Sequence, residues 1–371
     1  MQVIRKGLIL AAFWLCKLLG VFDLARRLTR SRLRVLCYHG FALDDEARFR
    51  ESLFISRERF ERRMRYLRNS GFRVLPLDEA HRRLRAGTLP HDAVAITIDD
   101  GFHSTHAVAK DILARHRFPA TLYLTSYYFQ KGTPVFQLAV DYICWKSPRS
   151  TVDLSGLGIA GLDGATAIAF GDDVRREVSR IVHAHGSALP DEAARVALSR
   201  RLAGRLGVDY DAIAQSRILS LVSPRELQEL QASGMRIGLH THRHRLPESQ
   251  AEALRELADN RAAVEPVIGR RMTDFCYPSG VWSAGHRPAL RRAGVETATT
   301  CESGLVDRHR DPYLLPRILD DSRVSMIEFE AELSGFCEVL RSVRARTHRN
   351  AVALWHACES LPGCVAPALS I

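Results

Sequence analysis

Two short apolar stretches, each running directly into acidic or imidazole side chains, constrain this chain most. The first reads AVAITIDDGF, from Ala93 to Phe102. Its continuous apolar start with β-branched residues is typical of a buried parallel strand. Such a strand delivers Asp99 and Asp100 to its carboxyl end, where α/β folds hold their active sites. Neighbouring strand side chains point to opposite faces, so we expect a sharp turn, permitted by Gly101, to bring both carboxylates to one site.

Two adjacent carboxylates repel each other and are costly to desolvate. A bound cation, or a division of labour between the two acids, would explain them. The alternative is an Asp-Asp-Gly turn that caps the following helix.

The second stretch, Met235 to Leu246, reads MRIGLHTHRHRL. His240 and His244 share a face whether the backbone is extended or helical, so both can hold one ion. Zinc accepts imidazole and carboxylate ligands, and a His-His-Asp set leaves positions open for water and substrate. A solvated basic turn is the alternative, but the separate Asp-Asp strand end favours a metal site.

The segments around these stretches alternate between strand and helix patterns, which predicts parallel strands with right-handed crossovers. Strands are expected at 34–38, 72–77, 120–125, 273–277 and 296–300, and helices at 56–70, 77–86, 105–116, 224–232, 249–267, 286–293 and 325–333. From about Tyr128 to Ile218 this rhythm fails, and a mainly helical insertion is predicted. It is either a lid or substrate-recognition module or a structural elaboration.

Three motifs carry a family resemblance. TIDDGF resembles the T-F-D-D-G motif of the polysaccharide deacetylase family (NodB homology, carbohydrate esterase 4). HTHRHRL resembles that family's H-[ST]-x-x-H-x-x-L motif, one residue short at the Leu. FCYPSG, from Phe275 to Gly280, resembles the F-x-Y-P-Y-G loop of one branch. The resemblance runs from about Val35 to Arg317, interrupted by the insertion.

The resemblance implies a distorted (β/α) barrel of the NodB-homology type with a mainly helical insertion. It also implies a metal-dependent hydrolase that removes an acyl group, usually acetyl, from an N- or O-acetylated sugar of a polysaccharide or lipid-linked glycan. Such an enzyme acts on carbon–nitrogen bonds other than peptide bonds, or on ester bonds. Carried over by position, Asp99 is the general base, while Asp100, His240 and His244 are the ligands of a divalent metal, expected to be zinc.

The third motif departs from the family pattern. Ser279 stands where Tyr is usual, so only its backbone N–H could serve as oxyanion donor. Tyr277 and Pro278 of the same loop, together with His39 after the first strand, are assigned to substrate binding at the metal rim. Arg317 is predicted to orient Asp99, with a surface position as the alternative. The general acid stays unassigned, because Leu354-Trp355-His356 matches its motif only in letters.

Two other functions remain open on the sequence. One is a non-catalytic, metal-containing glycan-binding relative, in which the third-motif changes have removed turnover. The other is a basic, membrane-associated adaptor. A nucleic-acid-binding protein is not expected, because no basic and aromatic module accompanies the formal net charge of +11.

Much of that charge lies in the first 34 residues, where eight Lys and Arg side chains face the single Asp23. The 16-residue run from Gly7 to Phe22 is apolar except for Lys17. This is shorter than the roughly 20 residues of a spanning helix. An interfacial helix held on anionic lipid fits best, and a buried N-terminal helix is the alternative.

The cysteines show neither a C-x-x-C pair nor a regular spacing, so we expect buried thiols in a reducing compartment. This favours the cytoplasmic face of the inner membrane and leaves the periplasmic side open. The expected domains are 1–32, a membrane-associated helix; 33–128, the first part of the barrel; 129–222, the insertion; 223–340, the second part; and 341–371, a C-terminal tail.

Overall fold

The computed structural model describes residues 2–164 and 166–344, with side chains from Lys6 onward. The described chain divides into two compact units. Residues 33–323 form the larger one, and residues 2–32 together with 324–344 form the smaller one. The sequence-based domain boundaries remain predictions, as does the C-terminal tail, most of which lies outside the described residues.

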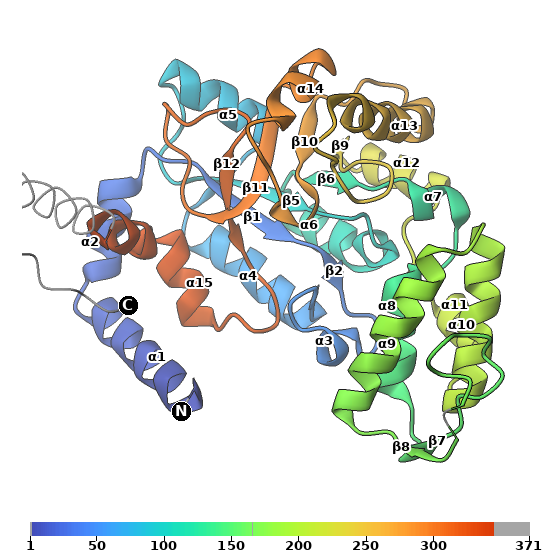
Figure 1. The fold of residues 1–371 in the computed structure, drawn as a ribbon. Helices are drawn as coiled ribbons and strands as arrows, with labels where there is room; N and C mark the ends of the chain where they lie inside the picture. The colour runs from blue at the N-terminus through green and yellow to red at the C-terminus, as the bar shows by residue number, and fades with distance from the viewer. Residues whose placement is uncertain (1, 165, 345–371) are drawn as a thin grey trace, which may run out of the picture. The chain divides into compact units, whose positions relative to one another are not determined.

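Parallel strands of the larger unit close into a ring, in the order β1, β12, β11, β10, β9, β6, β5 and back to β1 (Figure 1). Their bounds are β1 Arg34–Tyr38, β5 Ala93–Ile98, β6 Thr121–Leu124, β9 Arg236–Leu239, β10 Asp274–Cys276, β11 Thr297–Ser303 and β12 Leu315–Leu319. A short strand, β4 (Arg73–Val74), pairs only with the start of β5. The predicted distorted (β/α) barrel is thereby confirmed.

Most of the predicted helices surround this ring. Their bounds are α4 Arg57–Asn69, α5 Leu77–Ala86, α6 Lys110–His116, α12 Pro224–Ala232, α13 Gln250–Ile268 and α14 His286–Arg292. Ser223 explains where α12 begins, because its side chain and Glu226 form a reciprocal capping box. Loops at the strand ends hold β2 (Gly40–Phe41), α3 (Glu46–Phe49), β3 (Phe54–Ile55) and the 3₁₀ turn η2 (Pro278–Gly280).

Two predicted elements differ from the structure. The strand expected at 72–77 shrinks to the two residues of β4, because Pro76 precedes helix α5 directly. The helix expected at 105–116 begins as a π-helical turn, η1 (Thr105–Ala109), before α6. π-Turns are frequent at functional sites, and this one is separated from the Asp-Asp-Gly turn by three residues.

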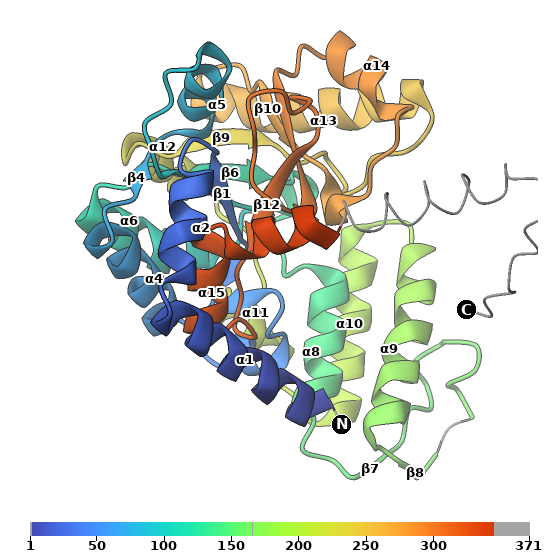
Figure 2. The same ribbon diagram turned by 90° about the vertical axis from the view of Figure 1, so that its left-hand side faces the viewer.

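The segment predicted as an insertion is mainly helical. Its elements are α7 Tyr127–Lys131, α8 Phe136–Lys146, β7 Thr151–Val152, β8 Ile168–Ala169, α9 Asp172–Ser187, α10 Glu192–Leu206 and α11 Tyr210–Ser216. Helices α8, α9 and α10 run side by side (Figure 2). The two short strands pair antiparallel at one end of this helical group.

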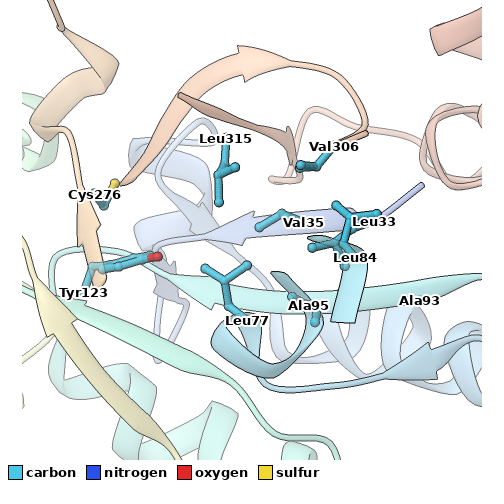
Figure 3. Close-up of a cluster of buried hydrophobic side chains, with 11 residues drawn as sticks. Leu33, Val35, Leu77, Leu84, Ala93, Ala95, Tyr123, Cys276, Val306 and Leu315 are labelled. Carbon is cyan, nitrogen blue, oxygen red and sulfur yellow. The ribbon is translucent and has the colours of Figure 1, made fainter. Parts of the chain in front are cut away.

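The barrel is filled by apolar side chains rather than open (Figure 3). One buried cluster joins residues of five ring strands with residues of α5, namely Val35, Ala93, Ala95, Tyr123, Cys276 and Leu315 with Leu77, Ala80 and Leu84. A cluster contributed by so many strands of one ring lies inside it. This core fixes the strand ends that carry the polar residues of the site.

The smaller unit consists of α1 (Gln2–Leu18), α2 (Val21–Thr29), α15 (Met326–Leu333) and the residues that follow α15. Its core joins Phe13, Phe22 and Ala25 to Ile327 and Phe336. The helix predicted at 325–333 is confirmed, with Ser325 and Glu328 as a capping box.

A second set of apolar residues in the smaller unit is exposed: Leu8, Trp14, Leu15, Leu18, Leu19, Leu24 and Leu28. Among the described residues, no single helix is both long and apolar enough to cross a bilayer. The pair Lys6–Leu18 and Val21–Thr29, bent by 78°, meets the requirement jointly by length and composition. The chain changes direction between them at Gly20, whose φ of 73° is left-handed.

The cysteines of the described chain are free thiols. Cys37, Cys144 and Cys276 are buried, as predicted, whereas Cys16, Cys301 and Cys337 are partly exposed. Cys358 and Cys364 lie outside the described residues.

Candidate active site

The chain turns sharply where β5 ends, as predicted. Asp100 and Gly101 have φ angles of 67° and 88°, and the Gly101 N–H donates to the Asp99 carbonyl at 2.8 Å. A Cβ atom on residue 101 would lie 2.2 Å from Leu124 Cδ1, so close packing also requires glycine. The turn gives the adjacent carboxylates different surroundings: Asp99 faces a buried arginine, and Asp100 faces two imidazoles.

Asp99 forms a bidentate ion pair with Arg317 of β12. Arg317 Nη1 donates to Oδ1 at 2.8 Å and Nη2 donates to Oδ2 at 2.7 Å, and both side chains are buried. The Cys276 thiol also donates to Oδ2, at 3.3 Å. Burial alone would raise the pKa of Asp99, but the charge and hydrogen bonds of Arg317 outweigh it and hold that pKa well below its usual range. The carboxylate is therefore fixed in orientation and ionised.

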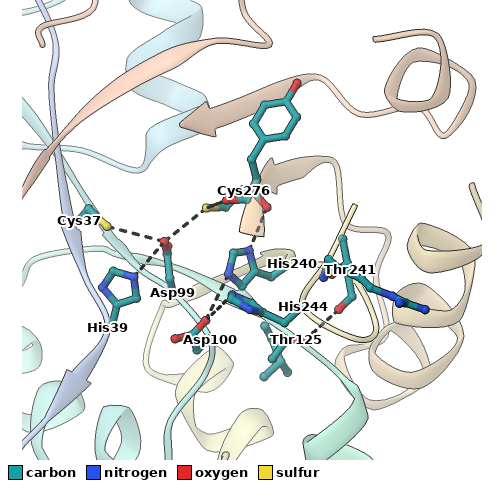
Figure 4. Close-up of polar contacts among 12 residues, drawn as sticks. Cys37, His39, Asp99, Asp100, Thr125, His240, Thr241, His244 and Cys276 are labelled. Carbon is teal, nitrogen blue, oxygen red and sulfur yellow. Dashed lines mark hydrogen bonds and ion pairs between the residues drawn. The ribbon is translucent and has the colours of Figure 1, made fainter. Parts of the chain in front are cut away.

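Asp100, His240 and His244 converge from two strand ends (Figure 4). The Nε2 atoms of His240 and His244 lie 3.3 and 3.2 Å from Asp100 Oδ1. His240 Nδ1 is 2.9 Å from the Cys276 carbonyl, which fits the tautomer with its N–H on Nδ1 and leaves the Nε2 lone pair facing Asp100. The structure thus brings together the three ligands predicted from the sequence.

The donor set of this triad fits a divalent metal ion. Asp100 Oδ1 is buried and has no hydrogen-bond partner within the described residues, although two ring nitrogens face it. One carboxylate oxygen and two imidazole nitrogens within 4.8 Å of one another are atoms that zinc binds readily. Asp99 suits a cation less well, because the guanidinium of Arg317 already neutralises it.

Helix α13 supports the loop between the two histidines. The buried carboxylate of Glu256 accepts the backbone N–H groups of His242 and Arg243 at 3.1 and 2.8 Å. One turn further along, the Asn260 Oδ1 accepts the His240 N–H at 3.3 Å, and its Nδ2 donates to the Leu124 carbonyl at 2.9 Å. Sequence reasoning missed both residues, because nothing distinguishes them from the other polar residues of an amphipathic helix.

The other residues predicted for the site lie after β1 and in the loop after β10, and they differ in how close they come to the two aspartates and the triad. His39 Nε2 is 3.7 Å from Asp99 Oδ2, at the rim. Ser279 is exposed, with a left-handed φ of 56°. Pro278 and Tyr277 are buried, and the Tyr277 ring packs on Phe275 and His286, so its side chain is not brought to the triad. The substrate-binding roles of these residues remain predictions.

The third histidine of the motif, His242, is not part of the triad. Its Nδ1 pairs with the Ser126 hydroxyl at 2.9 Å. The Thr125 hydroxyl also donates to the His242 carbonyl, at 3.2 Å. His242 therefore ties the motif loop to the end of β6. The Leu354-Trp355-His356 segment lies outside the described residues.

A cavity of about 690 Å³ adjoins the triad at Asp100 and His244. On the barrel side it is lined by Leu53, Phe102 and Leu221, and on the insertion side by Val135, Phe136 and Leu138. Tyr127, Tyr128 and several arginines complete its wall. The insertion therefore contributes directly to the space beside the triad.

The comparisons with known proteins agree with this architecture. The sequence model of a family described as polysaccharide deacetylase matches residues 86–298, more than half of the chain. The fold is similar to that of Streptococcus pyogenes deacetylase PplD in complex with acetate, with 15% identity, 81% of this chain and 98% of that chain covered, and a TM-score of 0.52. It is also similar to IcaB from Ammonifex degensii, with 19% identity, 82% and 97% covered, and a TM-score of 0.50. No curated protein matches the chain.

Proposed function

The chain belongs to the polysaccharide deacetylase family and is an enzyme acting on acetylated sugars, and we propose that it is a metal-dependent hydrolase. Its proposed substrate is an N- or O-acetylated sugar of a polysaccharide or lipid-linked glycan. The observation that carries the metal dependence is the orphaned, buried Asp100 Oδ1, faced by His240 and His244.

The residues around the turn divide the chemistry between them. Asp100, His240 and His244 would hold the metal, with zinc the expected ion. Such an ion polarises an acyl carbonyl and makes water a stronger nucleophile near neutral pH. Asp99 accepts the proton of the attacking water, because its ionised carboxylate is held in a fixed orientation next to the ligands and is not itself one of them. Arg317 keeps that carboxylate oriented and charged.

The negative charge that develops on the carbonyl oxygen of the acyl group needs a hydrogen-bond donor. We assign this role to the backbone N–H of Ser279, in the exposed turn that follows β10. The side chain that would protonate the leaving group stays unassigned. Neither a non-catalytic glycan-binding relative nor a basic adaptor is favoured, since neither explains a base paired with Arg317 beside a complete ligand set.

We further propose that the N-terminal helices attach the enzyme to a membrane surface. The exposed leucines and Trp14 of α1 and α2 would enter the boundary between headgroups and acyl chains, while nearby Arg and Lys side chains contact anionic lipid. The proposed location is the cytoplasmic face of the inner membrane, which is consistent with the free thiols.

Metal content and acetate release, measured on the same preparations, test the assignment of the two carboxylates. Asp99→Asn should keep its metal and lose about 10²- to 10⁴-fold in rate on acetylated glycans, as expected when a general base is removed. Asp100→Asn should lose metal affinity and recover part of its rate in excess zinc. The reverse pattern would exchange the roles, and unchanged rates in both variants would exclude this site from the chemistry.

A further inference from the structure

The cavity beside the triad is too large for the group that a deacetylase removes. An acetyl group has two carbon atoms, whereas cavities of about 300–1,000 Å³ enclose whole ligands. The volume of about 690 Å³ therefore has to accommodate a part of the substrate that remains after deacetylation. Because the cavity begins at Asp100 and His244, this part lies next to the acetylated position.

The wall of the cavity is mainly hydrocarbon. Phe102, Phe136, Leu138 and Leu221 are buried within the protein, and the half-buried Val135 continues the same surface. Helix α8 contributes Phe136 and Leu138 to this wall, so the barrel loops alone cannot form it. An apolar wall gains free energy by covering apolar ligand surface, roughly in proportion to the area buried.

Several polar groups in this wall are already engaged within the protein. The Thr125 hydroxyl donates to the carbonyls of Thr241 and His242, both at 3.2 Å. Arg195 donates to the Tyr127 hydroxyl at 2.9 Å, and Arg50 donates to Asp141 at 3.0 Å.

A sugar ring needs a partner for each hydroxyl group that it buries. The apolar part of the cavity offers few such partners, so it suits a hydrocarbon chain better than a second sugar.

We propose that the substrate of this enzyme is an acetylated sugar with a hydrocarbon aglycone, and that the aglycone chain lies in the cavity between the barrel and the insertion. This inference rests on the proposed deacetylase function. The helical insertion is then a substrate-recognition element that selects lipid-linked sugars over water-soluble polysaccharides.

A series of N-acetylglucosamine glycosides with methyl, butyl, hexyl and octyl aglycones tests the proposal. The zinc-loaded full chain is titrated by calorimetry with each glycoside below its micellar concentration, and acetate release is measured in parallel. Affinity should rise about two- to fourfold for each added methylene, the gain expected from burying it. Equal affinity for all four glycosides would overturn the proposal.

A second series keeps the methyl aglycone and lengthens the N-acyl group from acetyl to hexanoyl. A gain in affinity confined to this series would place the hydrocarbon on the acyl side and refute the proposal. An increase with aglycone length supports the cavity assignment even when no acetate is released. Absence of acetate release from these glycosides and from a wider panel of acetylated glycans would instead count against the proposed function.

Val135→Trp tests where the hydrocarbon binds, because a larger side chain at this position fills the cavity. The gain with aglycone length should disappear, while affinity for the methyl glycoside stays within about twofold of the unmodified protein. Val208→Trp changes another half-buried valine of the insertion that does not line the cavity, and should leave the series unchanged. An unchanged gain in Val135→Trp would refute the location. If this variant fails to fold, the two ligand series still decide the proposal.

Discussion

Glu256→Gln is expected to weaken metal binding although Glu256 touches no ligand atom. Its carboxylate is 4% exposed, accepts two backbone N–H groups of the histidine loop, and pairs with Arg243 Nη1 at 2.8 Å. The glutamine amide replaces one carboxylate oxygen with an NH₂ group, which cannot accept a hydrogen bond. In one orientation this group faces the two loop N–H groups, and in the other it faces the guanidinium of Arg243. Hydrogen bonds to charged groups contribute about 1.5–3 kcal/mol each, so losing one or two of them loosens the loop substantially.

The effect on the metal follows from where this loop lies. His240 and His244 flank the residues that Glu256 holds. Loss of partners behind metal ligands typically reduces metal affinity about 10- to 100-fold. We expect a loss of this size in competition against a zinc-chelating dye. The rate should return to nearly normal at saturating zinc, because Glu256 does not contact the reacting atoms.

Glu265→Gln is the matched control on the same helix. Its carboxylate also accepts a backbone N–H, that of Met272 at 2.9 Å, and also pairs with an arginine, Arg261 at 3.2 Å, but it supports the approach to β10. This variant should lower the free energy of unfolding without changing zinc affinity. If Glu256→Gln binds zinc within twofold of the unmodified protein, or if both variants lose it equally, the reasoning is refuted.

Three further predictions concern stability and attachment. Arg63→Met leaves buried Asp320 without its bidentate partner and should lower the free energy of unfolding in urea by about 3–5 kcal/mol. Arg65→Met, on the exposed face of the same helix, should lower it by less than about 1 kcal/mol. Burial raises the pKa of Glu226, but hydrogen bonds with His103 and Arg217 outweigh it and lower the pKa overall. Glu226→Gln should therefore reduce the free energy of unfolding by its full amount above about pH 4.3, and by less as the pH falls below that value. A reduction that stays constant from about pH 7 to about pH 3 in urea unfolding would contradict this. The full chain should sediment with anionic vesicles in a partly salt-sensitive way, and a chain that begins at residue 33 should not; equal partitioning would refute attachment through the N-terminal helices.

The parts of the site that lie on strand ends could be predicted from the sequence. An apolar strand followed by Asp-Asp-Gly, and a second followed by spaced histidines, specify both the element and the place of the side chains on it. Parallel strands bring their carboxyl ends to one edge, so local patterns sufficed to predict that the Asp-Asp pair meets His240 and His244. The choice of Asp100 over Asp99 as the metal ligand rested on the family resemblance.

The residues behind the histidine loop and the cavity depend on contacts between segments far apart in the sequence, which a local pattern cannot predict. Glu256 and Asn260 reach the histidine loop only because α13 packs against β9, and the cavity exists only because α8 packs beside the barrel loops. The packing of the Tyr277 ring on Phe275 and His286 likewise depends on residues that its own motif does not specify. The strand expected at 72–77 was overestimated, because Pro76 cannot donate to a strand ladder and helix α5 begins directly after it.

The division of the smaller unit between the two ends of the sequence has a consequence for biosynthesis. Helices α1 and α2 leave the ribosome before the barrel, and their packing partner α15 follows only after the 291 residues from Leu33 to Arg323. At roughly 5–20 residues per second, this interval lasts about 15–60 s. During this time Phe13 and Phe22 have no α15 to pack against, so the nascent chain presents the apolar residues of α1 and α2 to chaperones or lipid while the barrel is still being synthesised.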